Sequence, residues 1–406
     1  MRCTAFALVA LWSAPLLVRA QDNAELLSRI KAMEERIRAL ESEVQVLKSQ
    51  QQPAPSPPPE PTQPPAPSPP PEPVQAFPQA AAGASKVFNP DIAVIGNFFG
   101  AAGQDAGRGA PALEMHESEL SLQAVVDPYA RADFFLSFGE QGVNLEEGYL
   151  TFTALPAGLQ LRAGKMRGAF GRVNTFHTHV LPWVDRPLVT QNLLGGEDGL
   201  NDAGLSLSRI LPAPKGVFLE ATAQVFRGDS EGVFQSWHRS NLSAIGHLRG
   251  YRDISESTNL DLGVSYARGH SPEGPSLINQ LYGLDATLRW KPLRRSIYRS
   301  MVTRSEFVWG RAQLPSEVAR PFGYYVSSDY QFARRWFFGG RLDRSERFSN
   351  TTLPDFGGSL VLTFWPSEFS QVRGQLRRTR YDDRQIANEL LFQFQFSIGA
   401  HGAHPF

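Results

Sequence analysis

Two pairs of histidines are the side chains in this sequence whose type and spacing most resemble metal ligands. His177 and His179 are separated by one residue, and His401 and His404 lie close together near the end of the chain. Imidazole is a suitable ligand for zinc, copper or nickel. Neither pair has an obvious third ligand nearby in the sequence, so polar or packing roles are the alternative interpretation. The sequence thus offers metal candidates without a complete site.

Charged side chains also gather in the segment 166–201, the longest link between the predicted strands. Its candidates for contact with a solute are Arg167, Arg172, His177, His179, Asp185, Arg186, Glu197 and Asp198. Opposite charges at a narrow passage create a local field that selects the solutes that pass. On an exposed loop the same charges would simply be solvated. The elements around this segment decide between the two interpretations.

Those elements are predicted to be β-strands with one apolar and one polar face. In 390–398, Leu390, Phe392 and Phe394 share one face, whereas Gln393 and Gln395 share the other, because side chains alternate along a strand. Sixteen such segments begin near residues 92, 115, 129, 145, 158, 202, 216, 240, 257, 279, 299, 321, 335, 356, 369 and 387. This pattern is typical of a transmembrane barrel with a lipid-facing apolar side and a wet lumen. A soluble β protein is the alternative, although charges recur at the inward positions.

The links between these segments alternate as well. Tight turns such as 127–128 and 366–367 alternate with longer polar links such as 100–114, 166–201 and 346–355. Outer-membrane barrels have short periplasmic turns and longer external loops. An even number of strands places both barrel ends on the periplasmic side. We therefore expect an all-β fold, with a 16-stranded antiparallel transmembrane β-barrel over residues 87–406.

Three segments precede the predicted barrel. Residues 1–20 have the charged start, apolar stretch and small-residue end of a signal peptide. Residues 21–50 are predicted to be a coiled coil, because apolar residues from Leu26 to Leu47 recur at alternating spacings of four and three. The charged residues that flank this apolar seam favour parallel association of the helices. Residues 51–86 are a Pro/Ala-rich disordered linker, with 13 prolines between positions 53 and 73, a composition that gives a stiff spacer.

The charge of the whole chain gives little information about partners. The 40 basic and 40 acidic residues balance, so we expect no nucleic-acid partner. Charges of both signs fall on the predicted lumen face and nearly cancel, which leaves ion selectivity open. The best basic patch on this face is formed by Arg373, Gln375 and Arg377.

The sequence contains no nucleophile-elbow serine, paired-carboxylate motif or phosphate loop, so we expect neither an enzyme nor a cofactor.

The order of signal peptide, coiled coil, linker and a barrel beginning near residues 88–92 resembles the phosphate-selective porins of the O and P type. The segments 181–187 and 199–204 resemble a group of porin-like proteins, some of them labelled zinc-regulated outer-membrane receptors. The resemblance implies a homotrimer in the lipid of the Gram-negative outer membrane. It also implies that 166–201 folds into the barrel and narrows it.

The predicted function is passive diffusion of small polar solutes or ions through an outer-membrane porin. The coiled coil and linker would lie in the periplasm, where the coiled coil could contact the cell wall. Three alternatives stay open: a zinc-related outer-membrane uptake protein, a structural tether between outer membrane and cell wall, and an outer-membrane hydrolase with a serine and a histidine at the barrel rim.

Overall fold

The computed structural model describes residues 90–106, 111–140 and 142–399. The predicted signal peptide, coiled coil and linker lie outside these residues, as do His401 and His404. Among the described residues no helix has both the length and the apolar character needed to cross a membrane.

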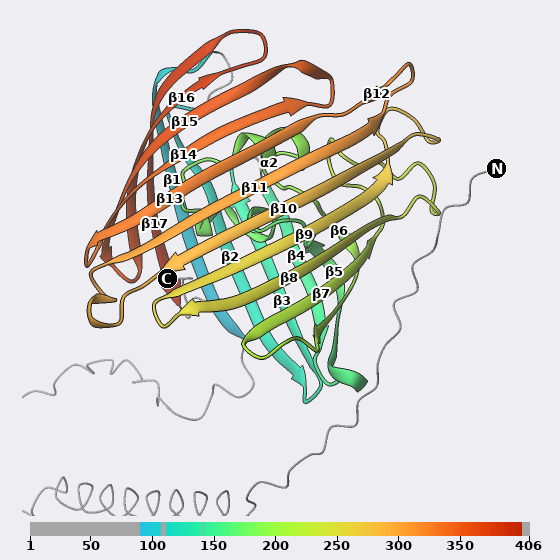
Figure 1. Cartoon of the computed structure of the whole chain (residues 1–406), viewed down its shortest axis with the longest axis horizontal. Coiled ribbons are helices and arrows are strands. Elements are labelled where there is room, and N and C mark those ends of the chain that lie inside the picture. The colour runs from blue at the N-terminus through green and yellow to red at the C-terminus, as the bar shows by residue number, and fades with distance from the viewer. Residues whose placement is uncertain (1–89, 107–110, 141, 400–406) are drawn as a thin grey trace, which may run out of the picture. The chain divides into compact units, whose positions relative to one another are not determined.

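Sixteen antiparallel strands form one barrel, and a two-residue strand, β12, is added beside β11 (Figure 1). The strands are β1 Asp91–Gln104, β2 Leu113–Asp127, β3 Ala130–Gly139, β4 Gly142–Phe152, β5 Leu159–Arg167, β6 Asn201–Leu211, β7 Val217–Phe226, β8 Ser243–Ser255, β9 Thr258–His270, β10 Ile278–Trp290, β11 Ser300–Gln313, β12 Val318–Ala319, β13 Phe322–Ala333, β14 Trp336–Arg347, β15 Asn350–Ser367, β16 Ser370–Arg380 and β17 Ile386–Gly399.

The barrel closes between its first and last strands. β1 pairs with β17 from Ala93 opposite Gly399 to Gln104 opposite Asn388. Among the described residues each barrel strand pairs with a neighbour on both sides, although β4 pairs with β5 only from Gly148 to Phe152. The first and last residues of the barrel segment therefore lie side by side, at the end of the barrel that carries the short turns. This end is called the short-turn end, and the opposite end is called the long-link end. The predicted fold class is confirmed for the barrel.

One predicted long link is wrong. The segment 346–355 is not a loop, because β14 and β15 continue to a two-residue turn at positions 348–349. Their pairing is irregular between Ser345 and Arg347, and Pro354, which cannot donate a backbone hydrogen bond, lies in the unpaired stretch. The carboxylate of Asp355 accepts a hydrogen bond from Arg347 across the two strands. This contact extends the hairpin beyond what the turn-rich sequence indicates.

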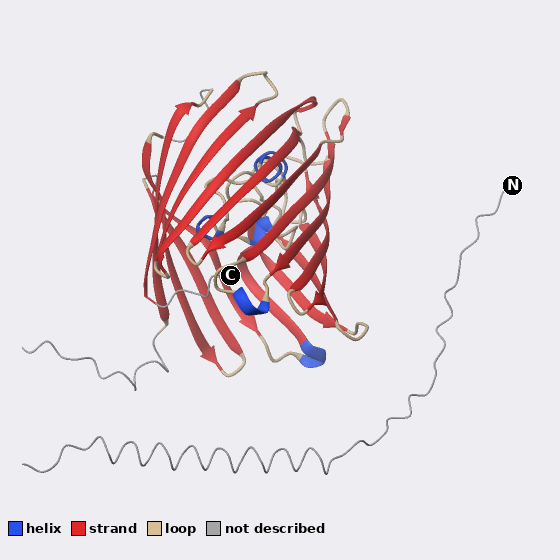
Figure 2. Ribbon diagram, turned by 60° about the vertical axis from the view of Figure 1, so that its left-hand side comes forward, coloured by secondary structure: helices blue, strands red, loops and turns tan. Residues whose placement is uncertain are grey.

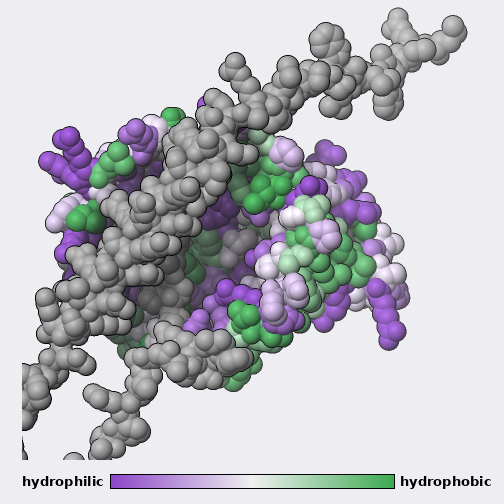
Figure 3. Space-filling model, turned by 90° about the horizontal axis from the view of Figure 1, so that it is seen from below, coloured by the Kyte–Doolittle hydropathy of each residue, from purple (hydrophilic) through white to green (hydrophobic). Residues whose placement is uncertain are grey.

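The two faces of each strand differ as the alternation predicted. In β17, Leu390 is 50% exposed on the outside, whereas Gln393 on the inside is 0% exposed. Apolar side chains gather in patches on the outer wall in the space-filling view (Figure 3). Buried polar side chains such as Asp261, Thr287 and Gln395 line the inside. The fold thus places apolar side chains outside and polar ones inside, which is the reverse of a soluble barrel.

The segment between β5 and β6, residues 168–200, lies inside the barrel and is called the inner loop below. Its helical turns η2 (Val173–Thr175), η3 (Thr178–Val180) and α2 (Leu188–Leu193) are visible within the ring of strands (Figure 2). Two further turns, η1 (Pro156–Gly158) and η4 (Leu293–Arg295), lie at the short-turn end. Buried side chains of the inner loop form one apolar core with inward residues of the wall, among them Phe170, Trp183, Val189, Leu281, Val308 and Tyr325.

Candidate functional site

A single asparagine holds the two ends of the inner loop together. Asn174 is fully buried. Its Nδ2 atom donates to the carbonyls of Gly168 at 2.8 Å and Leu200 at 3.0 Å, and its Oδ1 atom accepts from the Leu200 N–H at 2.8 Å. A direct backbone bond joins Gly168 N–H to the Leu200 carbonyl at 2.6 Å. The side chain therefore acts as a clamp at the neck of the loop.

The first stretch of the loop is bound by a buried carboxylate on β11. Oε1 of Glu306 accepts the backbone N–H groups of Arg172 and Val173, each at 2.7 Å. Gly171 precedes them with a φ of 60°, and a Cβ there would lie 2.7 Å from Oε2 of Glu306. Only glycine combines this left-handed backbone with so close an approach. The Glu306 carboxylate thus fixes the backbone at residues 172–173 and requires glycine at position 171.

The middle of the loop is bound by β14 and β16. Trp183 is fully buried, with its ring 5.2 Å from the Tyr325 ring and the Arg341 guanidinium 4.9 Å from its centre. The next N–H, that of Val184, donates to Oε1 of Gln375 at 2.8 Å. Arg373 donates to the Trp183 carbonyl at 3.2 Å. The predicted basic patch is therefore the surface on which the loop rests, and its groups are engaged by the loop.

Asp185 is the charged centre of this attachment. Its Oδ2 atom lies 2.9 Å from Arg341 and 2.9 Å from Arg377. Arg341 also pairs with Asp343, and Arg377 with Glu389. Burial alone would raise the pKa of the Asp185 carboxyl, but Arg341 and Arg377 outweigh it and hold this pKa well below its usual range. Asp185 is therefore a structural anion.

The helix α2 is attached to the same side of the barrel. The Leu188 N–H donates to Oδ1 of Asp343 at 3.2 Å, and Nδ2 of Asn192 donates to Oδ2 of Asp355 at 2.9 Å. Leu188 and Val189 are buried. Because both acceptors are strand carboxylates, the helix is held by the wall of the barrel at β14 and β15.

The two loop histidines face other strands, at β2 and β4. Nδ1 of His177 lies 2.8 Å from Oε2 of Glu119 and 3.0 Å from Oε2 of Glu146, and Nδ1 of His179 lies 3.3 Å from Oε2 of Glu119. Burial alone would lower the pKa of His177, but Glu119 and Glu146 outweigh it and raise this pKa to about 10. The loop thus spans the lumen from β2 and β4 to β14 and β16.

The other predicted site residues either stabilise the inner loop through contacts or line a cavity. Arg167 is buried and pairs with Glu146 at 2.9 Å, and Arg186 is buried and donates to loop carbonyls at Val173 and Phe176. The guanidinium of Arg172 lies over the Phe176 ring. Glu197 and Asp198 are exposed. The last two are therefore the exposed members of the predicted set, and Glu197 pairs with His116.

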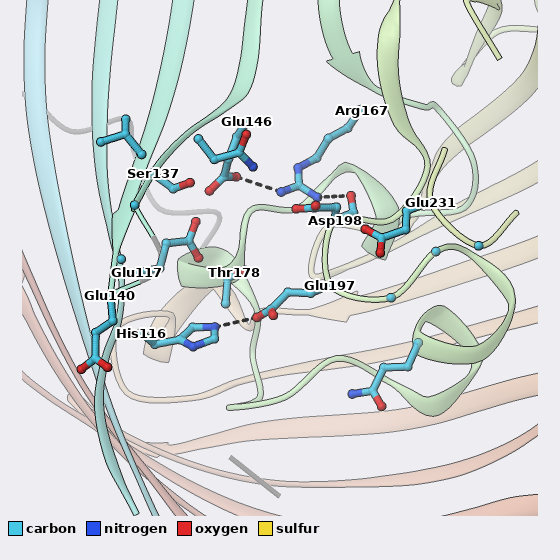
Figure 4. Close-up of a pocket in the computed structure, with 18 of the residues that line it drawn as sticks. His116, Glu117, Ser137, Glu140, Glu146, Arg167, Thr178, Glu197, Asp198 and Glu231 are labelled. Atoms are coloured by element: carbon cyan, nitrogen blue, oxygen red, sulfur yellow. Dashed lines mark hydrogen bonds and ion pairs between the residues drawn. The ribbon is translucent and has the colours of Figure 1, made fainter. Parts of the chain in front are cut away.

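Glu197 and Asp198 line a cavity of about 710 Å³ at the long-link end. Figure 4 shows Glu197 facing His116 across it, with 2.6 Å between Oε1 and Nε2, and Arg167 directed at Glu146. Seven carboxylates line this cavity, including those of Glu140 and Glu231, against the cationic Arg167 and the His116 imidazole. The cavity is therefore strongly acidic.

A second cavity of about 700 Å³ lies at the short-turn end, on the other side of the inner loop. Cationic groups prevail in it over the carboxylates of Asp329 and Glu368; they are Arg289, Lys291, Arg304, Arg334, Arg335 and Arg373. Leu181 and Pro182 of the loop and the apolar Phe337 also line it. The lumen thus changes the sign of its lining charge across the inner loop.

No family model matches the chain. A protein of Aquifex aeolicus (strain VF5), described as uncharacterized, is 30% identical over 337 residues, which cover 72% of this chain and 70% of that protein. The chain belongs to the family of this Aquifex protein. Identity of this extent over most of both chains indicates a shared fold, and the family relation by itself carries no activity.

Solved structures with the same fold are outer-membrane porins and channels. The anion-selective porin of Comamonas acidovorans has a TM-score of 0.53 at 10% identity and covers 76% of this chain and 98% of its own. The channel DcaP of Acinetobacter baumannii has a TM-score of 0.52 at 11% identity, covering 76% and 96%. The trimer form of OmpT from Vibrio cholerae has a TM-score of 0.51 at 8% identity, covering 76% and 99%. The barrel therefore has a porin fold.

Sequence reasoning did not single out several residues that the structure makes central. Asn174, Glu119, Glu146 and Glu306 bind the inner loop at its neck and at two sides of the wall. The strand alternation indicated only that Glu119 and Glu306 point inward. It carried no information about which loop residue each would meet.

Proposed function

We propose that the protein is an outer-membrane channel through which small polar solutes and ions diffuse down their gradient. The observation that carries this proposal is the inner loop, which crosses the lumen and is bound to wall strands on several sides. A polar lumen interrupted by a firmly attached segment suits a size-limited passage. The fold shared with porins and channels supports it.

The proposed orientation follows from the link lengths. The short turns and both barrel ends would face the periplasm, together with residues 21–50 and 51–86, which could reach the cell wall. The acidic long-link cavity would then be the external entrance. We also propose a homotrimer; the parallel charge pairing of the predicted coiled coil supports association, and one structural neighbour is described in a trimer form.

The charge distribution makes the external entrance attractive to cations and the periplasmic cavity attractive to anions. Arg373 and Arg377, which could have belonged to a phosphate path, are engaged with the Trp183 carbonyl and Asp185. In this proposal, the resemblance to phosphate-selective porins extends to the architecture and not to phosphate selectivity.

Single-channel conductance in planar bilayers tests the proposal. The variant replaces residues 174–196 with a short Gly-Ser linker, and heat-modifiable migration on gels reports folding. We expect a larger conductance and passage of larger sugars. Equal conductance of wild type and variant would remove the inner loop from the path, and absence of conductance in both would favour the tether.

The deletion also removes part of the apolar core, so a second variant keeps the loop and loosens it. Combining Asn174→Ala with Asp185→Asn removes the neck clamp and the charged attachment. We expect higher mean conductance with larger fluctuations of the open current. A folded variant whose mean conductance and current fluctuations equal those of wild type would contradict the proposed role of the inner loop in limiting the passage.

A further inference from the structure

Four side chains converge where the inner loop meets β2 and β4. His177 and His179 come from the loop, Glu119 from β2 and Glu146 from β4. One ligand atom from each of Glu119, Glu146 and His177 lies within 4.8 Å of the others. Nδ1 of His179 lies 3.3 Å from the same Oε2 atom of Glu119 that His177 approaches. Three donor atoms therefore lie within reach of one ion, and His179 lies beside them at Glu119.

Two of these atoms are close together without making a hydrogen bond. Oε2 of Glu119 and Nδ1 of His177 are 2.8 Å apart, yet both are buried and neither has a hydrogen-bond partner of acceptable geometry among the described residues. Glu119 is only 3% exposed, and a buried carboxylate oxygen without a partner is costly. A metal ion placed between them would bind both atoms at once.

The surrounding charge also calls for a cation. Glu117 hydrogen-bonds Glu146, and Glu147 lies 3.6 Å from Nε2 of His177, so four carboxyl groups meet in this region. Arg167 is the guanidinium that pairs with Glu146 and Glu147. Arg167 and the His177 imidazole face these carboxyl groups, and a divalent cation between His177, Glu119 and Glu146 would add to the compensation that buried charges require.

We propose that Glu119, Glu146, His177 and His179 bind a divalent transition-metal ion, with zinc as the best fit. Two imidazoles and two carboxylates are ligands that zinc takes in tetrahedral sites, at about 2.0–2.2 Å, which places the donors about 3.3 Å apart. The separations of 2.8 and 3.0 Å from Nδ1 of His177 to Glu119 and Glu146 require only a small outward shift. His179, now 3.3 Å from Glu119, would move toward the same ion as the fourth ligand. This site goes beyond the channel function and does not depend on it.

The neighbours of the four ligands suit the same assignment. Oε1 of Glu147 lies near Nε2 of His177, the nitrogen that faces away from the ion, as in carboxylate–histidine–metal arrangements. The Phe135 ring, 4.9 Å from the His177 ring, covers the imidazole. Arg167 donates to Oε2 of Glu146, so this carboxylate would share that oxygen or bind through the other one. A bound ion would tie the inner loop to β2 and β4.

Metal titration of the full-length protein, folded in detergent and stripped with EDTA, tests this proposal. Calorimetry with ZnCl₂ near neutral pH should show one equivalent per chain, and Co²⁺ should give the visible absorption of a tetrahedral complex. The variants Glu119→Gln, His177→Gln and His179→Gln should each lose at least about tenfold in affinity. Heat-modifiable migration confirms that each variant is folded.

Two controls separate this cluster from other histidines. His238→Gln changes an exposed histidine outside the cluster, and His401→Gln combined with His404→Gln removes the predicted second pair. Both controls should keep full affinity. Loss of binding in the tail variant, unchanged binding in the cluster variants, or no binding by the wild type would overturn the proposal; the last result would leave the cluster as a set of ion pairs.

Discussion

Oδ2 of Asp185 on the inner loop lies 2.9 Å from Nη2 of Arg341 on β14. The same oxygen lies 2.9 Å from Nη1 of Arg377 on β16. One loop carboxylate thus pairs with two inward guanidinium groups that are far from it in sequence. This relationship makes the attachment of the loop a measurable part of barrel stability.

Replacing Asp185 with asparagine should destabilise the folded barrel. The change leaves the buried Arg341 and Arg377 without their shared anion, and breaking a buried pair costs about 3 kcal/mol in free energy of unfolding. Urea unfolding in lipid vesicles, followed by tryptophan fluorescence, measures it. Asp253→Asn, at an exposed carboxylate, should have little effect. Equal midpoints for the two variants would contradict the assignment.

The contribution of Asp185 should depend on pH in one direction. Its pKa is lower in the folded state than in the unfolded state, where it is about 3.9. The stabilisation is therefore complete above the unfolded pKa and is lost as the pH falls through the folded pKa. The difference in unfolding free energy between wild type and Asp185→Asn should shrink in strong acid. Asp343 and Glu389, which face the same arginines, are present in both proteins, so the comparison isolates Asp185. A difference that grew on acidification would reject this account.

Removing the neck clamp should loosen the inner loop without removing its attachments to the wall. Asn174→Ala deletes three hydrogen bonds and leaves the buried Leu200 N–H unpaired, at a cost of about 2 kcal/mol or more in unfolding free energy. Limited proteolysis should cut within the inner loop faster than in wild type. Asn144→Ala, at an exposed position, is the matched control and should be cut at the wild-type rate.

The two cavities should shift ion preference in opposite directions. Glu197→Gln with Asp198→Asn removes exposed negative charge at the long-link end, and the reversal potential under a KCl gradient should move toward anion preference. Arg334→Gln with Arg335→Gln removes positive charge at the short-turn end and should move it toward cation preference. Because both pairs are exposed, folding should be unaffected. Shifts of the same sign, or none, would show that the cavities do not set selectivity.

Local patterns in the sequence were sufficient to predict the barrel. The alternation in 390–398 predicted which side chains face outward, and the observed exposure of Leu390 and burial of Gln393 agree with it. The reason is physical: strand side chains alternate whatever the strand pairs with. The predicted link 346–355 failed because Asp355 and Arg347 bind across the hairpin, a contact between side chains that turn composition does not report.

The sequence by itself determined the strands, the length of the segment 166–201 and the charged residues within it. Only the tertiary structure decided what those residues do. Asp185 meets Arg341 and Arg377, and His177 meets Glu119 and Glu146, because barrel closure and strand register bring distant inward positions to one level of the lumen. Such contacts depend on strand register and on the path of the inner loop. Neither of these is encoded in the spacing of residues along one segment.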